Sequence, residues 1–212
     1  MKTIICGDSF CVTDPAFPGL HWSEKLLEMS EHIEICNLAA GGCSNAMITL
    51  QLMQALRFKP DFVILSFTNE HRYESDAKID AMPYGLTVDS IAAYLKERYK
   101  ANNSRKTDFL ELSTNFEKLK NYFHIMFCLQ TLKSKGINFC FSLGGFEYQQ
   151  DYTALLRSNF LENTVFDYTA HELSLNLWYH GQKSSPYFHV DNEEVHTLFA
   201  NECLAHLNKS HA

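Results

Sequence analysis

Four short blocks of consecutive apolar residues mark the sequence, separated by longer stretches in which apolar residues recur every three or four positions. None of the blocks shows the strict apolar–polar alternation of a strand with one face in water. Continuous apolarity over so few residues is typical of strands covered on both faces, as in a parallel sheet. The predicted strands are Thr3–Cys6, Ile33–Cys36, Phe62–Ser66 and Ile137–Ser142.

The stretches between and after these blocks carry the period of an α-helix. Helices are predicted over His21–Met29, Ser44–Leu56 and about Asp108–Lys135, with a last helix after an N-cap at Asp191 or Asn192. Ser44 or Asn45 caps the second helix, because short polar side chains accept hydrogen bonds from the first turn. Gly136 ends the third helix.

The apolar positions also predict which face of each helix is buried. In the second helix this face is Met47, Leu50, Met53 and Leu56. In the third it is Phe109, Leu112, Phe116, Leu119, Phe123, Phe127 and Leu132. In the last it is Val195, Phe199, Cys203 and Leu207, with His196 in the same stripe.

Alternating strands and helices predict an α/β fold, a parallel, doubly wound sheet between two helical layers. The 212 residues are expected to form a single domain. Residues 71–107 interrupt the alternation after the third strand. We interpret this segment as an insertion or lid on the carboxyl side of the sheet.

Charge and cysteine content exclude several classes of function. The formal net charge is −7 and Lys and Arg are scattered, which argues against nucleic acid as a partner. No apolar run is long enough to span a membrane, and no signal segment precedes the first predicted strand. The seven cysteines lack paired Cys-x-x-Cys spacing. They predict reduced thiols, a cytoplasmic location and no metal site.

The tetrapeptide Gly7-Asp8-Ser9-Phe10 directly follows the first predicted strand. In open parallel sheets, ligands and reactive side chains gather at the carboxyl ends of the strands. Ser9 is therefore a candidate nucleophile. The same residues also suit a turn with a helix cap and no chemistry, so the tetrapeptide alone leaves both interpretations open.

Three further blocks lie at later strand ends or before the last helix: Asn37–Asn45, Phe67-Thr68-Asn69-Glu70 and Pro186-Tyr187-Phe188-His189. In this order, the four blocks resemble those of the SGNH hydrolase superfamily, also called GDSL esterases and lipases. The resemblance implies a flavodoxin-like, three-layer α/β/α fold.

The resemblance also implies the parts of a catalytic site. Ser9 matches the nucleophile and His189 the general base. Gly42, with Gly41 as the alternative, and Asn69 match the donors of an oxyanion hole. A serine hydroxyl needs such a base, and the tetrahedral intermediate needs such donors.

Two blocks depart from the superfamily pattern. Phe67 and Glu70 stand where a Gly and an Asp usually flank the asparagine. Pro186 stands where an Asp usually precedes the histidine by three residues. Asp191 or a backbone carbonyl would then have to orient the imidazole. His196 remains a rival base, although its place in an apolar stripe predicts a buried, hydrogen-bonded side chain.

The resulting hypothesis is a serine hydrolase that cleaves an acyl or acetyl ester of a lipid, carbohydrate or small molecule, without a metal or organic cofactor. One alternative, favoured by the missing acid, is a catalytically weak or inactive binding or structural protein on the same fold. Another is a flavodoxin-like nucleotide binder. Against it stands the lack of a glycine-rich phosphate loop after the first strand.

Overall fold

The computed structural model of the chain describes residues 1–13, 18–30, 32–40, 43–68, 110–144, 150–165 and 193–210. Within these ranges, the side chains of Ser9, Arg157, Val195 and residues 110–118 and 150–153 are not described. The predicted insertion at 71–107 and the predicted caps Asp191 and Asn192 lie outside the described residues.

Four parallel strands form the sheet: β1 (Lys2–Cys6), β2 (Glu34–Asn37), β3 (Phe62–Ser66) and β4 (Asn138–Ser142). Their order across the sheet is β2-β1-β3-β4, and every neighbouring pair is parallel. All four predicted strands are confirmed. Since β1 lies beside β3 in the centre, the loops that follow these two strands open at the same edge.

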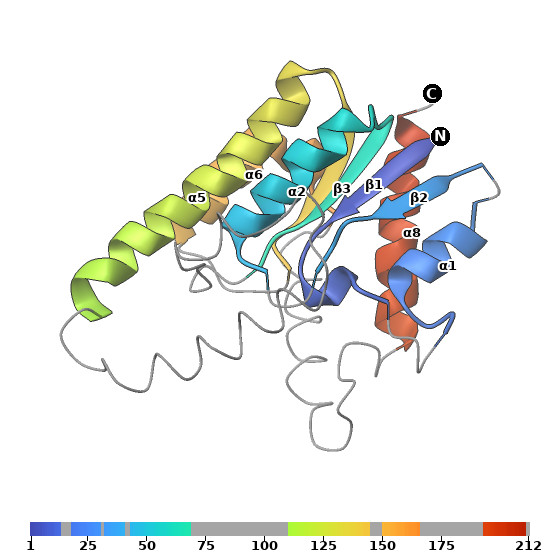
Figure 1. The fold of residues 1–212 in the computed structure, drawn as a ribbon, viewed down its shortest axis with the longest axis horizontal. Coiled ribbons are helices and arrows are strands. Elements are labelled where there is room, and N and C mark those ends of the chain that lie inside the picture. The colour runs from blue at the N-terminus through green and yellow to red at the C-terminus, as the bar shows by residue number, and fades with distance from the viewer. Residues whose placement is uncertain are drawn as a thin grey trace, which may run out of the picture.

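Helices cover both faces of this sheet, so the predicted three-layer α/β/α fold is confirmed (Figure 1). On one face lie α1 (Trp22–Glu28) and α8 (Glu193–Lys209). On the other lie α2 (Asn45–Arg57), α5 (Leu110–Ser134) and α6 (Gln150–Phe160). Two 3-10 turns complete the described elements, η1 (Ser9–Cys11) and η2 (Leu161–Asn163).

Side chains alternate along the strands and divide the core into two halves. Ile4 and Cys6 of β1 pack with α2, α5 and α6, whereas Ile5 packs with α1 and α8. The strands therefore lack polar alternation because both of their faces are covered by helices.

Two local signals have the predicted effect. The Ser44 hydroxyl caps α2 by accepting a hydrogen bond from the Met47 N–H at 3.4 Å. Gly136 follows the end of α5 with φ of +65°, a left-handed conformation that glycine adopts without strain.

The predicted buried faces of α2 and α5 are wrong in part. Met47 and Leu132 are buried as predicted, whereas other members of each face are exposed. Phe109 and the side chains of Leu112 and Phe116 lie outside the described part of the chain.

In α2, Leu50 and Met53 are 46% and 45% exposed, while Ile48, Gln51 and Leu52 are fully buried. A helical period indicates a stripe, but it does not say which side of the helix meets the sheet.

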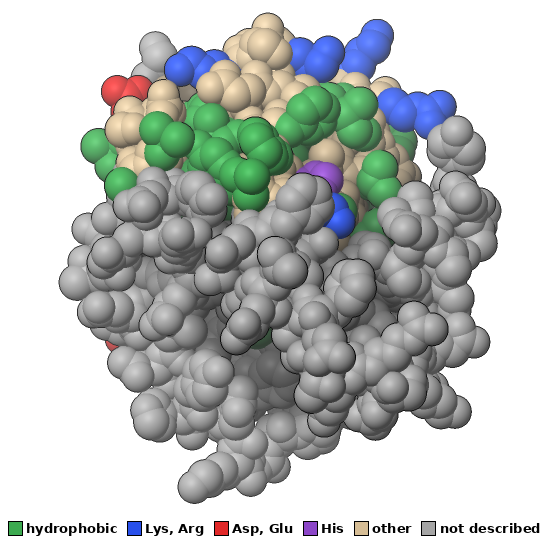
Figure 2. All heavy atoms as spheres, turned by 90° about the vertical axis from the view of Figure 1, so that its left-hand side faces the viewer, with side chains coloured by type: hydrophobic (Ala, Val, Ile, Leu, Met, Phe, Trp, Pro, Cys, Tyr) green, Lys and Arg blue, Asp and Glu red, His purple; other side chains and the backbone are tan. Residues whose placement is uncertain are grey.

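The error is larger in α5. Phe123 and Phe127 are 60% and 50% exposed, whereas Ile125, Cys128 and Leu129 are completely buried. Both sides of this helix carry apolar residues at helical spacing, so its pattern alone could not separate them. Hydrophobic side chains accordingly reach the surface in the described part of the view in Figure 2.

In α8 the prediction holds in part, because Cys203 and Leu207 are buried as expected and Phe199 is partly buried. His196 is also buried, with 9% of its surface exposed.

Candidate active site

The carboxyl ends of β1 and β3 are joined through the carboxylate of Asp8. The Thr68 hydroxyl donates to Asp8 Oδ2 at 2.7 Å, and the Phe10 N–H donates to Asp8 Oδ1 at 3.0 Å. Both Asp8 and Thr68 are fully buried. A buried carboxylate is costly unless its oxygens accept hydrogen bonds. Asp8 meets this requirement by tying the two loops of the edge together.

The backbone of Ser9 begins the 3-10 turn η1, directly after Asp8. The Cys11 N–H closes this turn onto the Asp8 carbonyl at 3.0 Å. The Cys11 carbonyl in turn accepts from Asn37 Nδ2, at the end of β2, at 2.6 Å. The Ser9 backbone is therefore held on both sides by hydrogen bonds that sequence alone does not reveal.

Gly7 is required at this edge by packing. A Cβ on Gly7 would overlap with Cys11 Sγ and would lie 3.2 Å from the Ser66 carbonyl oxygen. The close approach of η1 to β3 thus depends on a residue without a side chain at position 7.

Two side-chain amides of α2 bind the backbone just before the candidate catalytic positions. Gln51 accepts from the Gly7 N–H at 2.8 Å and donates to the Gly7 carbonyl at 3.1 Å. Asn45 accepts from the Thr68 N–H at 2.9 Å and donates to the Thr68 carbonyl at 3.0 Å. Each amide satisfies one buried residue's backbone donor and acceptor. Gly7 stands two residues before Ser9, and Thr68 stands directly before Asn69.

Sequence patterns alone do not assign either amide to the site. The sequence patterns indicate Asn45 as a possible helix cap and as the end of the second block, and they do not distinguish Gln51. The signal appears only once the buried face of α2 is known, since Asn45 and Gln51 lie on the side that also carries Ile48 and Leu52. A polar side chain among buried apolar ones needs a partner, and here the partner is a loop backbone.

The predicted site residues are only partly described. Gly42, with its alternative Gly41, Asn69, His189 and Asp191 lie outside the described residues. Of Ser9 the backbone is described and the side chain is not.

The described neighbours of these residues do converge on the same edge. The Ala40 N–H, two residues before Gly42, donates to the Gly7 carbonyl at 3.2 Å. Thr68, directly before Asn69, binds Asp8. The chain segments that lead into Gly42 and Asn69 are thus both attached to the loop that carries Ser9.

The first turn of α8, which follows Asp191, is attached to the start of α1. Lys25 forms an ion pair with Glu193 at 2.8 Å, and this hydrogen-bonded ammonium lowers the pKa of the Glu193 carboxyl. The Trp22 N–H donates to His196 Nδ1 at 3.0 Å. His196 is therefore buried and hydrogen-bonded, as its place in the helical stripe indicates.

Cys11 is the thiol closest in sequence to Ser9, and its surroundings disfavour the thiolate. Burial raises its pKa well above the ordinary value, and the nearby Asp8 carboxylate raises it further. A protonated, buried thiol is a poor nucleophile. All seven cysteines are free, and burial likewise raises the pKa of Cys128 to about 12.

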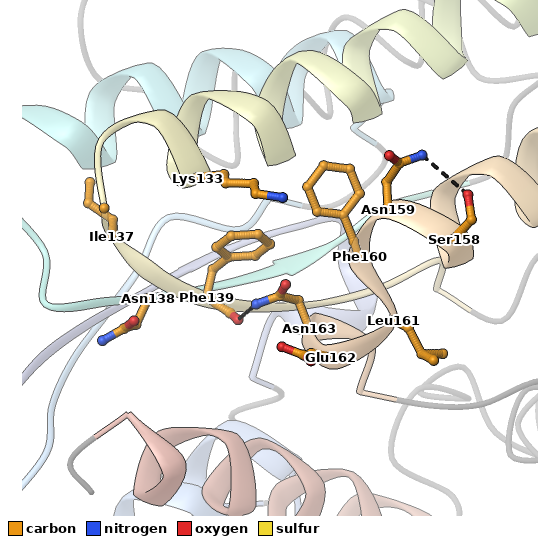
Figure 3. A pocket seen from close by; sticks show the side chains of 11 residues that line it. Lys133, Ile137, Asn138, Phe139, Ser158, Asn159, Phe160, Leu161, Glu162 and Asn163 are labelled. Carbon is orange, nitrogen blue, oxygen red and sulfur yellow. Dashed lines mark hydrogen bonds between the residues drawn. The ribbon is translucent and has the colours of Figure 1, made fainter.

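A pocket of about 550 Å³ lies at the opposite edge of the sheet, at the amino end of β4 (Figure 3). Lys133, Asn138, Phe160 and Glu162 are among the residues that line it. It contains none of the candidate site residues. Among the described residues, no cluster of His, Cys, Asp or Glu could hold a metal ion, and no helix could cross a membrane.

No protein-family model matches the chain and no curated protein is significantly similar to it, whereas several solved structures are. A member of the lipolytic protein G-D-S-L family from Veillonella parvula superimposes with a TM-score of 0.53 at 16% identity, covering 97% of each chain. The esterase EstA from a Pseudoalteromonas species superimposes with a TM-score of 0.50 at 11% identity, covering 98% of this chain and 97% of that one.

This chain has the SGNH-hydrolase fold. The fold resemblance and the parallel sheet order agree with the architecture expected from the four sequence blocks. In the SGNH-hydrolase fold of this chain, Ser9 starts the turn after β1, and Asp8, Gln51 and Asn45 fasten the surrounding loops.

Proposed function

We propose that the protein is a serine hydrolase that cleaves carboxylic esters, with Ser9 as nucleophile and His189 as general base. The observation that carries the proposal is the position of Ser9 directly after β1, one of the two central strands, in a turn fixed through buried Asp8. The likeness to solved GDSL proteins supports the same reaction class, since it extends over nearly the whole chain.

In the proposed reaction, Ser9 Oγ attacks the ester carbonyl carbon while His189 takes the hydroxyl proton. The amides of Ser9, Gly42 and Asn69 donate to the oxyanion that forms. The intermediate collapses, and the alcohol leaves with the proton from His189. Water then attacks the acyl-enzyme and gives a proton to His189. The second intermediate collapses as Ser9 Oγ leaves with that proton, which restores the serine and neutral His189 and releases the carboxylic acid.

Orientation of His189 requires a partner on its other ring nitrogen. Pro186 stands where the superfamily usually has the orienting acid, so we assign this part to Asp191 or to a backbone carbonyl. Acyl or acetyl esters are the proposed substrate class, carried on a lipid, a carbohydrate or a small molecule.

The test is labelling with a fluorophosphonate, whose phosphorus forms a bond to Ser9 Oγ as fluoride leaves. Mass mapping should locate the adduct on Ser9, and hydrolysis of p-nitrophenyl acetate should fall by several orders of magnitude in Ser9→Ala without loss of folding. Labelling and turnover that persist in Ser9→Ala would contradict the proposal. A wild-type protein with neither would be a binding protein on the same fold.

A further inference from the structure

The ring of His21 connects the start of α1 to the turn that begins with Ser9. His21 is fully buried and is the N-cap residue of α1. Its Nδ1 accepts from the Ser23 N–H at 3.2 Å and lies 2.7 Å from the Ser23 hydroxyl. Its Nε2 lies 3.0 Å from the carbonyl oxygen of Phe10, the residue after Ser9.

These contacts determine the protonation of the ring. A carbonyl oxygen only accepts hydrogen bonds, so His21 Nε2 must carry the proton that it shares with Phe10. Nδ1 is then the acceptor for the Ser23 N–H. The imidazole is neutral, and each of its nitrogens has a different task.

A second donor meets the same carbonyl. Trp22 Nε1 donates to the Phe10 oxygen at 2.9 Å. The Phe10 N–H is held by Asp8, as described above, so both polar groups of the Phe10 backbone are occupied by side-chain atoms. Asp8 thus orients the Ser9–Phe10 peptide, and the two donors to the carbonyl orient the Phe10–Cys11 peptide.

Helix capping does not account for this arrangement. Asn, Asp or Ser at the N-cap would accept from the first turn and are the residues that helices prefer there. None of them is long enough to reach Phe10 from the same position as well. The additional Nε2–H is what histidine contributes at position 21, and it is directed at the turn of the candidate nucleophile.

We propose that His21 is a positioning residue for the nucleophile: its Nε2–H, together with Trp22 Nε1, holds the Phe10 carbonyl and thereby fixes the backbone that presents Ser9. This inference rests on the proposed function, in which Ser9 attacks the ester. A small displacement of an attacking atom can lower the rate about 100-fold, so such a hydrogen bond acts on rate more than on substrate binding.

The decisive variants separate the two tasks of the ring. In His21→Asn the side-chain oxygen can still accept from Ser23, but the side chain is too short to reach Phe10. In His21→Gln the side-chain nitrogen can take the place of Nε2. The matched control is His206→Asn. His206 is also buried, with 9% of its surface exposed, and its Nε2 lies 3.2 Å from the backbone carbonyl oxygen of Thr164.

We expect His21→Asn to keep a cooperative thermal transition while fluorophosphonate labelling of Ser9 and kcat fall about 10–100-fold with little change in KM. His21→Gln should recover most of the rate, and His206→Asn should label like the wild type. Wild-type labelling with an equal rate in His21→Asn overturns the positioning role alone. Absence of label in the wild type overturns the proposed function and this role with it.

Trp22→Phe keeps the test decisive if His21→Asn does not fold. It removes the second donor to Phe10 and retains a large apolar side chain. A folded Trp22→Phe protein that labels several-fold more slowly than the wild type supports the positioning of the Phe10 carbonyl. Labelling at the wild-type rate overturns it.

Discussion

The two edges of the same sheet are built in different ways. At the carboxyl edge, Asp8, Asn45, Gln51 and Thr68 are fully buried and bind one another or loop backbone. At the amino edge, the hydrogen bond from the Lys2 N–H to Asp61 is exposed to solvent. Burying polar groups requires precise pairing, whereas groups in water need none.

The loop backbones at the carboxyl edge are therefore held more firmly than those at the amino edge. The described hydrogen bonds of the carboxyl edge fix loop backbones, which is what a site of chemistry needs before substrate arrives. The pocket at the amino edge is lined by exposed side chains such as Ser158, Asn159 and Leu161. Substitutions at the carboxyl edge should therefore lower kcat or stability strongly, whereas substitutions at the amino edge should have small effects on stability.

After Ser9→Ala, the largest effect is expected for His189→Ala. Loss of the general base should lower kcat for p-nitrophenyl acetate by about 10²–10⁴-fold and leave the melting temperature nearly unchanged. His196→Ala is the control, because His196 accepts from the Trp22 N–H inside the protein and its loss should mainly lower the free energy of unfolding. The opposite pattern would make His196 the base.

The next largest loss of activity is expected for Asn69→Ala. Removal of one oxyanion donor typically lowers kcat about 10²–10³-fold, and KM should change little because the donor acts in the transition state. Steady-state kinetics with the same ester measure both constants. If only KM rises, Asn69 binds substrate and does not stabilise the oxyanion.

Asn45→Ala tests the buried amide against its counterpart at the amino edge. It leaves the Thr68 N–H and carbonyl without their partner and should lower the free energy of unfolding by about 2–4 kcal/mol. Asn163→Ala removes a single part-buried hydrogen bond, from Asn163 Nδ2 to the Phe139 carbonyl at 3.0 Å, and should cost about 1 kcal/mol. Urea unfolding of both variants measures the difference. Equal losses would mean that the two edges are equally ordered.

The smallest effects are expected on stability, for alanine substitutions at Gly7 and Gly136. Gly7→Ala places a Cβ against Cys11 Sγ and should destabilise by about 1–3 kcal/mol through overpacking. Gly136→Ala meets no atom within 4 Å, so only its φ of +65° opposes the change, at about 1 kcal/mol. Thermal unfolding compares the two. A neutral Gly7→Ala variant would show that η1 can move away from β3.

Local properties of the sequence determined much of the fold. Each predicted strand begins and ends within one residue of its observed bounds, because apolar residues without polar interruption favour burial on both faces. The Ser44 cap and the Gly136 stop depend on contacts within one or two turns of helix, which neighbouring residues specify by themselves.

Only the tertiary structure decided which helix faces are buried. Phe123 and Phe127 form as good a helical stripe as Ile125 and Leu129, and the position of the sheet selects between them. The same holds for the polar contacts of the carboxyl edge. Asn45 binds Thr68 and His21 binds Phe10 across distances in sequence that no local pattern spans, because these partners meet only when the strands and helices have packed.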